Sequence, residues 1–164
     1  MPSSLIRQFP DPVLRKVSTR VPKIDRSITD LVERLIETMK KQPGGVGIAA
    51  PQIGVLKQVA IVDVSRKVPQ AKLLVLINPE IVSFEKWQVF REGCMSLPDY
   101  TANVKRADRV RVKWQGIDLK GYELIANGLE ARCIQHEIDH LNGFLFVDRV
   151  VSLKSDVFRR KHYL

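Results

Sequence analysis

The chain has 164 residues, enough for a folded domain with its own hydrophobic core, and we expect a single domain over residues 1–164. A hydrophobic fraction of 45% with 27% charged residues is typical of a soluble globular protein, and no apolar run reaches the roughly 18 residues that cross a membrane. The net charge of +9 favours a polyanionic neighbour such as RNA or the ribosome, although a merely basic surface would give the same charge. Two cysteines are too few for a disulfide framework.

Residues 1–24 are predicted to form an extended arm, because four prolines in this segment interrupt any helix. A helix is predicted next, since apolar residues recur at intervals of three and four from Ile28 to Met39. Ser27 is the expected N-cap, and the helix should end before Pro43. We interpret this N-terminal helix as an amphipathic structural element.

Residues 45–52, with the sequence GVGIAAPQ, are small, apolar and rich in glycine. The Lys-Ser/Thr pair of a phosphate-binding P-loop is absent, so a nucleotide site is not indicated. Small side chains instead allow another backbone to approach, and a strand edge that accepts a peptide is one use of such a segment. A tight structural turn is the alternative. Gln52 is the one side chain of the segment that can polarise a carbonyl group.

The middle of the chain contains short apolar or alternating segments that end at turn residues, which is typical of β-strands. The predicted strands are residues 59–64, 73–77, 81–84, 87–90, 109–114 and 121–126. Asn78 and Pro79 are expected to end the second of them, and a short helix through Leu153, Val157 and Phe158 is expected after Ser152. Helices stand apart from the strands along the sequence, so the predicted fold class is α+β, with mixed, mostly antiparallel sheets.

The strongest motif is His-Glu-x-x-His at residues 136–140. On a helix, residues four apart share a face, so His136 and His140 can bind one divalent metal ion together. Glu137 lies beside them, close enough to exchange a proton with a water molecule at the metal. A core helix with two incidental histidines is the alternative, but the chain has only three histidines and two of them fall here.

The helix that carries this motif is expected to begin after its N-cap, Asn127, and to end at Gly143. An apolar stripe follows one side of the helix: Ile134, Ile138 and Leu141. A second side, which includes Gln135 and Asp139, is predicted to face solvent. The side with both histidines should then line a cavity, which makes this a central helix.

A catalytic zinc-type site has three protein ligands and one open position, so one ligand remains to be identified. Cys133 precedes His136 by three residues, but a metal held by both histidines would lie too far along the helix axis for its short side chain. Cys94 is preferred, because it lies in a turn after a strand, from which a thiolate can reach a helix. A buried free cysteine is the alternative reading of Cys94. The other candidates for the third ligand follow the helix: Asp148, Asp156 and His162.

Three segments together resemble the three motifs of the peptide deformylase family: GVGIAAPQ at 45–52, EGCMS at 92–96 and QHEIDH at 135–140. Their order and spacing match the family, and the similarity extends over nearly the whole chain. The resemblance implies one catalytic domain, in which mixed strands surround a central metal-binding helix. It implies an enzyme that hydrolyses an amide with the help of a metal. It implies that this enzyme removes the formyl group from the N-terminal formyl-methionine of nascent polypeptides and releases formate.

The resemblance also implies roles for individual residues. The implied metal ligands are Cys94, His136 and His140. The implied catalytic groups are Glu137 as general acid and base, with Gln52 and the backbone N–H of Met95 as stabilisers of the oxyanion. The residues implied to contact the substrate are Val46, Gly47, Leu129 and Cys133. Glu92 and Arg106 are implied to support the cysteine loop as a pair.

Two positions depart from the family pattern. Gly44 stands where many members carry an acidic residue, and Thr101 stands where some carry an arginine that contacts the peptide. Neither is implied in the chemistry, so both concern sequence preference beyond the methionine. The implied cofactor is one divalent metal ion, with Fe²⁺ first and Zn²⁺, Ni²⁺ or Co²⁺ as alternatives, because thiolate and imidazole ligands suit all four.

Two other functions compete with this interpretation. One is a metallopeptidase that cuts internal peptide bonds, and the other is a structural metal protein that binds a partner such as the ribosome through its basic tail. The most concentrated basic patch of that tail is Arg159, Arg160, Lys161 and His162. The N-terminus lacks the core of a signal peptide, which predicts a bacterial cytoplasmic protein, although a mature organellar form would have the same features. Neither a membrane nor a specific DNA is expected as a partner.

Overall fold

The computed structural model describes residues 4–160. The helical elements of this part are η1 (Pro12–Arg15), α1 (Arg26–Lys40), η2 (Ala50–Ile53), α2 (Gly128–Leu141), η3 (Phe146–Arg149) and α3 (Leu153–Asp156). The strands are β1 (Gly47–Ala49), β2 (Val59–Val62), β3 (Leu74–Cys94), β4 (Leu97–Gln115), β5 (Gly121–Asn127) and β6 (Val157–Arg159). Among these helices, none is long and apolar enough to span a membrane.

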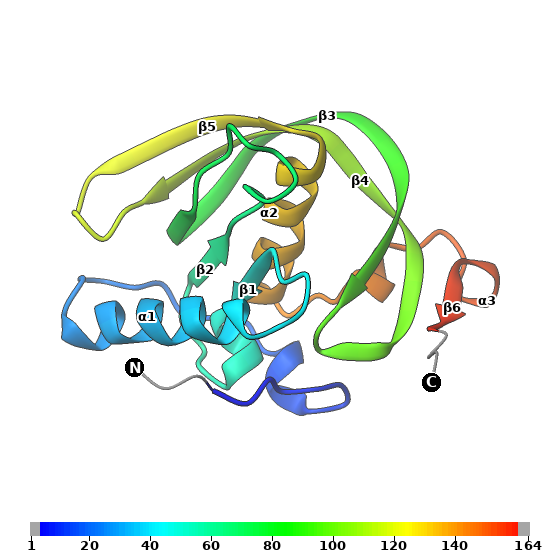
Figure 1. Ribbon diagram of the computed structural model, residues 1–164, viewed down its shortest axis with the longest axis horizontal. Coiled ribbons are helices and arrows are strands. Elements are labelled where there is room, and N and C mark those ends of the chain that lie inside the picture. Colours follow the sequence, from blue (N-terminus) through cyan, green and yellow to red (C-terminus); the bar gives the residue numbers. More distant parts are fainter. Residues whose placement is uncertain (1–3, 161–164) are drawn as a thin grey trace.

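The strands form one curled sheet in the order β1-β2-β3-β4-β5, and β6 pairs with β4 (Figure 1). Every pairing between these strands is antiparallel, so the fold is α+β with antiparallel strands, as the sequence predicted. The strands β3 and β4 are much longer than expected, with 21 and 19 residues. They form one long hairpin, and the short strands predicted at 81–84 and 87–90 are parts of β3.

The prediction that Asn78 and Pro79 end a strand is wrong. Asn78 has a positive φ of 51°, and the register with β4 shifts between Ile77 and Glu80, so the chain makes a bulge there and continues in β3. The Asn78 side chain accepts a hydrogen bond from the N–H of Val21 at 2.8 Å and donates one to its carbonyl at 2.9 Å. The N-terminal arm therefore stabilises a backbone conformation that would otherwise favour a turn.

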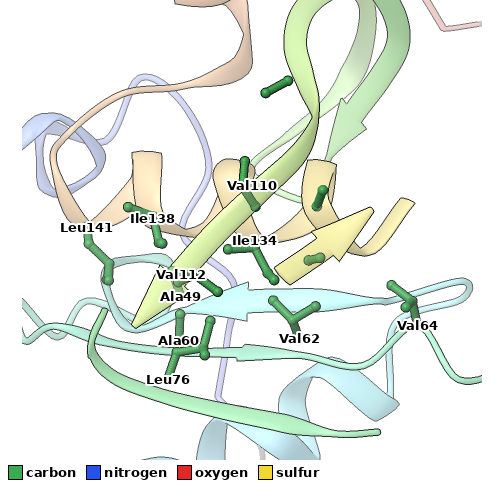
Figure 2. Close-up of a cluster of buried hydrophobic side chains, with 13 residues drawn as sticks. Ala49, Ala60, Val62, Val64, Leu76, Val110, Val112, Ile134, Ile138 and Leu141 are labelled. Carbon is green, nitrogen blue, oxygen red and sulfur yellow. The ribbon is translucent and has the colours of Figure 1, made fainter. Parts of the chain in front are cut away.

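The helix α2 lies inside the curl of the sheet, and its apolar stripe packs into the main core (Figures 1 and 2). Ile134 and Leu141 are at most 2% exposed, and Ile138 is 9% exposed. They meet side chains from several strands, of which Figure 2 labels Ala49, Ala60, Val62, Leu76, Val110 and Val112. Burial of a side chain of this size stabilises the fold by about 1.5–3 kcal/mol, so this packing fixes the position of the residues on the other sides of α2.

Two residues of α2 that were predicted to face solvent are buried, with Gln135 4% and Asp139 8% exposed, whereas Asn142 at the end of the same side is exposed as predicted. The strand β4 covers the two buried side chains. The Gln135 amide accepts a hydrogen bond from the N–H of Ala107 at 3.0 Å and donates one to its carbonyl at 2.7 Å, so it pairs with β4 as a backbone would. Asp139 contacts Arg106 of the same strand. Polar side chains therefore attach α2 to β4.

The helix α1 packs against β1, β2 and η2 through a second core cluster that includes Leu31, Leu35 and Met39. Its N-cap is Asp25 rather than the predicted Ser27, because the Asp25 carboxylate accepts the N–H of Ile28 at 3.3 Å. The helix expected in the tail is also shorter than predicted. It ends at Asp156, and the following residues form β6.

Candidate metal centre and substrate pocket

Three donor atoms meet at the junction of α2 with the hairpin of β3 and β4. The Sγ atom of Cys94 lies 3.4 Å from Nε2 of His140, which lies 3.2 Å from Nε2 of His136, and all three atoms are within 4.8 Å of one another. A tetrahedral ion with bonds of about 2.1 Å separates two of its ligand atoms by about 3.4 Å. The side chains are buried and their spacing suits a single ion, so the residues present fit a divalent metal.

The other residues considered as third ligand lie elsewhere. Cys133 lines the neighbouring pocket, and burial raises the pKa of its thiol to about 12, which keeps it neutral. Asp148 forms an ion pair with Arg15, and Asp156 accepts a hydrogen bond from the N–H of Ser152. His162 is outside the described residues.

A buried pair of charges orients His136. Its Nδ1 atom contacts the carboxylate of Glu92, which in turn accepts two hydrogen bonds from Arg106, at 3.1 Å from Nε and 2.8 Å from Nη2. Burial disfavours the charged carboxylate, but His136 and Arg106 outweigh this effect and lower the pKa of Glu92 to about 2. Glu92 therefore stays ionised, and it fixes the ring so that Nε2 faces the other two donors.

The network continues beyond Arg106 to the surface. Nη1 of Arg106 donates to Asp139 at 2.5 Å, and Asp139 also accepts from Nε and Nη2 of Arg149, at 3.0 and 2.8 Å. Sequence reasoning identified the pair of Glu92 and Arg106, but it missed Asp139 as the second partner of Arg106 and Arg149 as the further partner of Asp139. Asp139 lies inside the metal motif but was assigned to the solvent face, and no spacing in the sequence points to Arg149.

Glu137 lies on the pocket side of α2, against β1. A Cβ atom built on Gly47 would lie 2.5 Å from Oε2 of Glu137, so glycine is needed for this close approach. The other carboxylate oxygen, Oε1, is buried and has no hydrogen-bond partner among the described residues. Burial raises the pKa of Glu137 to about 7, which lets it accept and return a proton near neutral pH.

The short helix η2 presents the amide of Gln52 to the same centre. Its Oε1 accepts a hydrogen bond from the N–H of Ala49 at 3.0 Å, and its Nε2 donates to Oγ of Ser96 at 3.1 Å and lies 3.7 Å from Sγ of Cys94. The N–H of Ser96 also lies 3.4 Å from that sulfur. Ser96 was not singled out in the sequence, although it belongs to the EGCMS segment. It fixes the Gln52 amide, whose nitrogen is directed at the metal centre.

A pocket of about 770 Å³ opens beside the three donors. It is lined by the residues predicted to contact substrate or its oxyanion: Val46, Gly47, Gln52, Met95, Leu129 and Cys133. Cys94, His136 and Glu137 reach the same space. Three arginines that sequence reasoning did not connect with the site also line it: Arg91, Arg132 and Arg160.

We expect Gly47→Ala to lower kcat/KM for the hydrolysis that the three sequence motifs imply by about 100-fold, because the added methyl group displaces the Glu137 carboxylate and a shift of about 1 Å has effects of this size. The measurement is steady-state kinetics together with thermal unfolding. Gly121→Ala on β5 is the matched control, since a Cβ atom there would meet nothing within 4 Å. Equal activity of the two variants would contradict the role given to this contact.

The three converging donor atoms, the Glu137 carboxylate and the open pocket beside them place the chain among the metal-dependent hydrolases that activate a water molecule. The sequence identifies which kind of hydrolase. A family model described as polypeptide deformylase matches residues 4–156, and the chain belongs to this family. Members remove the formyl group from the N-terminus of nascent peptides, so the chain is a hydrolase of formylated peptides.

Individual relatives agree with the family match. A peptide deformylase of Thermodesulfovibrio yellowstonii is 45% identical over 158 residues, which cover 95% of this chain and 94% of that protein. One of Rhizobium meliloti is 46% identical over 154 residues, covering 93% of this chain and 88% of that protein. The crystal structure of a peptide deformylase from Synechococcus elongatus in complex with actinonin has a TM-score of 0.85 at 39% identity, covering 94% of this chain and 82% of that chain. A class I type b peptide deformylase of Acinetobacter baumannii with Met-Ala-Ser bound has a TM-score of 0.84 at 33% identity, covering 91% of this chain and 99% of that chain.

Proposed function

We propose that Cys94, His136 and His140 hold one divalent metal ion, and that α2 is the metal-binding helix around which the sheet is arranged. The observation that carries this proposal is the convergence of one sulfur and two nitrogen atoms within 4.8 Å of one another, beside a pocket that Glu137 also lines. Fe²⁺ is the first candidate for the ion. Zn²⁺, Ni²⁺ and Co²⁺ are the alternatives, because one thiolate and two imidazoles suit all of them.

The bound ion would supply Lewis acidity, which lowers the pKa of a water molecule in the site. Glu137 takes the proton from the attacking water and later gives it to the leaving amine, a task that suits a carboxyl group with a pKa of about 7. Gln52 and the N–H of Met95 donate hydrogen bonds to the formyl oxygen as it becomes negative. Formate and a free N-terminus are the products.

The substrate peptide is proposed to pair with β1. In the described residues β1 is the edge of the sheet, with β2 on one side, and Val46 and Gly47 line the pocket on its free side. Leu129 and Cys133 would contact the methionine side chain, and the neutral Cys133 thiol suits such an apolar wall. The Met-Ala-Ser bound to the Acinetobacter baumannii relative supports a methionyl peptide as the ligand.

Residues 1–164 are proposed to form one catalytic domain, which the family match over 4–156 supports, with α1 as an amphipathic cover of β1 and β2. Contact with the ribosome through the basic surface and tail is proposed from the net charge of +9 and from the exposed side chains of Arg159 and Arg160. Lys161 and His162 lie outside the described residues. The bacterial relatives support a cytoplasmic location.

The test of this function is formate release from formyl-Met-Ala-Ser by protein prepared without oxygen, with the metal content measured on the same sample. We expect one formate per peptide, with turnover that follows the metal content. Acetyl-Met-Ala-Ser and a longer peptide with a blocked N-terminus serve as controls. A metal-loaded protein that released no formate, or that cut internal bonds of the blocked peptide, would overturn the proposal.

A further inference from the structure

The C-terminal strand holds a charged side chain at the substrate pocket. Ala102, Thr101 and Tyr100 of β4 pair with Val157, Phe158 and Arg159 of β6. The next residue continues this pairing, because the N–H of Arg160 donates to the carbonyl of Asp99 at 2.7 Å. The tail is therefore fixed to β4 up to Arg160.

Side-chain contacts also attach the tail to the hairpin of β3 and β4. The guanidinium of Arg91 on β3 lies 3.9 Å from the centre of the Phe158 ring, in a cation–π contact. The Arg160 guanidinium lies against Gly93, where an added Cβ atom would overlap it. Arg160 is exposed and lines the pocket together with Gly93 and Cys94, so its charge lies at the entrance of the pocket.

The charges around this entrance are not balanced. The acidic residues that line the pocket are Glu92, which is paired with Arg106, and the buried Glu137. Arg132 has Asp108 as a partner at 3.2 Å.

The other two arginines at the entrance, Arg91 and Arg160, have no acidic partner among the described residues. Arg91 donates to Asn103 and Thr101, which are neutral. Within residues 4–160, no carboxylate forms an ion pair with Arg91 or Arg160. An exposed guanidinium at the mouth of a peptide pocket favours an anionic ligand, since carboxylates accept paired hydrogen bonds from it.

We propose that Arg160, next to Arg91, binds a carboxylate of the substrate peptide in the first residues after the methionine. This inference rests on the proposed function, and it makes the C-terminal strand part of the substrate site. The chain then prefers formyl-methionyl peptides with Asp or Glu at the second or third residue. An extended peptide that leaves the metal centre along β1 advances about 3.3 Å per residue, so these positions reach the entrance.

The experiment compares two pairs of peptides with amidated C-termini, so that the side chain carries the single carboxylate. The pairs are formyl-Met-Asp-Ser with formyl-Met-Asn-Ser, and formyl-Met-Ala-Asp with formyl-Met-Ala-Asn. For the unmodified chain at low salt, we expect kcat/KM to be about fivefold higher for Asp than for Asn at one of the two positions, mainly through KM. In 0.5 M salt the preference should fall, since exposed charges are screened within about 4 Å at that ionic strength.

Arg160→Gln should bring the ratio of kcat/KM for Asp and Asn close to one, and Arg160→Lys should keep part of the preference. Lys154→Gln, which removes one positive charge from α3 outside the pocket, should keep the full ratio. A ratio near one in the unmodified chain, or an equal loss for both peptides in Arg160→Gln, would overturn the proposal. If the metal-loaded chain deformylated none of the four peptides, the proposed function itself would fail.

Discussion

Replacing Glu137 by glutamine is expected to lower kcat by about 10³-fold or more while the protein still binds its metal. The variant keeps the shape of the side chain but can neither take a proton from water nor return one to the amine. The variant should lose catalysis and keep the metal, because the Glu137 carboxylate is not one of the three converging donor atoms and is buried against Gly47 instead. Steady-state kinetics and metal analysis on the same preparation measure both effects.

Glu130→Gln is the matched control, because Glu130 lies in the first turn of the same helix and does not line the pocket. It should retain nearly full activity. If Glu137→Gln kept more than about a tenth of the turnover, the general acid and base would have to be another group, since this kind of catalysis contributes about 10²–10⁴.

Replacing Cys94 by serine is expected to weaken metal binding by at least about 100-fold, whereas Cys133→Ser should leave the metal stoichiometry unchanged. A serine hydroxyl is a much poorer ligand than a thiolate for a soft or borderline ion. Cys133 lies outside the group of converging donors, and its thiol stays neutral at pH 7 because burial raises its pKa to about 12. The measurement is metal content after dialysis, followed by titration of the metal-free proteins with Zn²⁺ or Co²⁺.

The cobalt titration adds a readout that does not depend on activity. A Co²⁺ ion bound to a thiolate has a characteristic charge-transfer absorption, which Cys94→Ser should lose and Cys133→Ser should keep. The reverse pattern would assign the sulfur ligand to α2 and would remove the basis for the proposed site.

The parts of the structure that local physics decides could be predicted from the sequence. The helix α2 begins directly after Asn127 as predicted, although the Asn127 side chain makes no capping hydrogen bond. Gly143 follows the end of the helix with a left-handed φ of 81°, as predicted. The choice of Cys94 over Cys133 used only the rise of a helix and the reach of a thiol. The structure brings Cys94 to the two histidines, and its role as a ligand stays a prediction.

Features that depend on contacts between distant residues could not be predicted. Asn78 and Pro79 favour a turn locally, and the bulge that keeps β3 continuous depends on hydrogen bonds to Val21, 57 residues away. The sequence around Asp139 predicts a solvent-facing residue, because nothing near it in the sequence indicates its partner Arg106, which lies 33 residues upstream. The short β6, which brings Arg160 to Gly93, has no pattern of its own in the sequence.

Residues near both ends of the described chain border the same opening: Ser4, Leu5 and Ile6 from the N-terminal arm, and Arg160 from the tail. An affinity tag or a fusion partner at either terminus would therefore be tethered close to the catalytic centre. Kinetic constants from tagged protein should be compared with those from protein whose tag has been cleaved. The turn around Asp118, between β4 and β5, does not border this opening and is the better place for a fluorescent label.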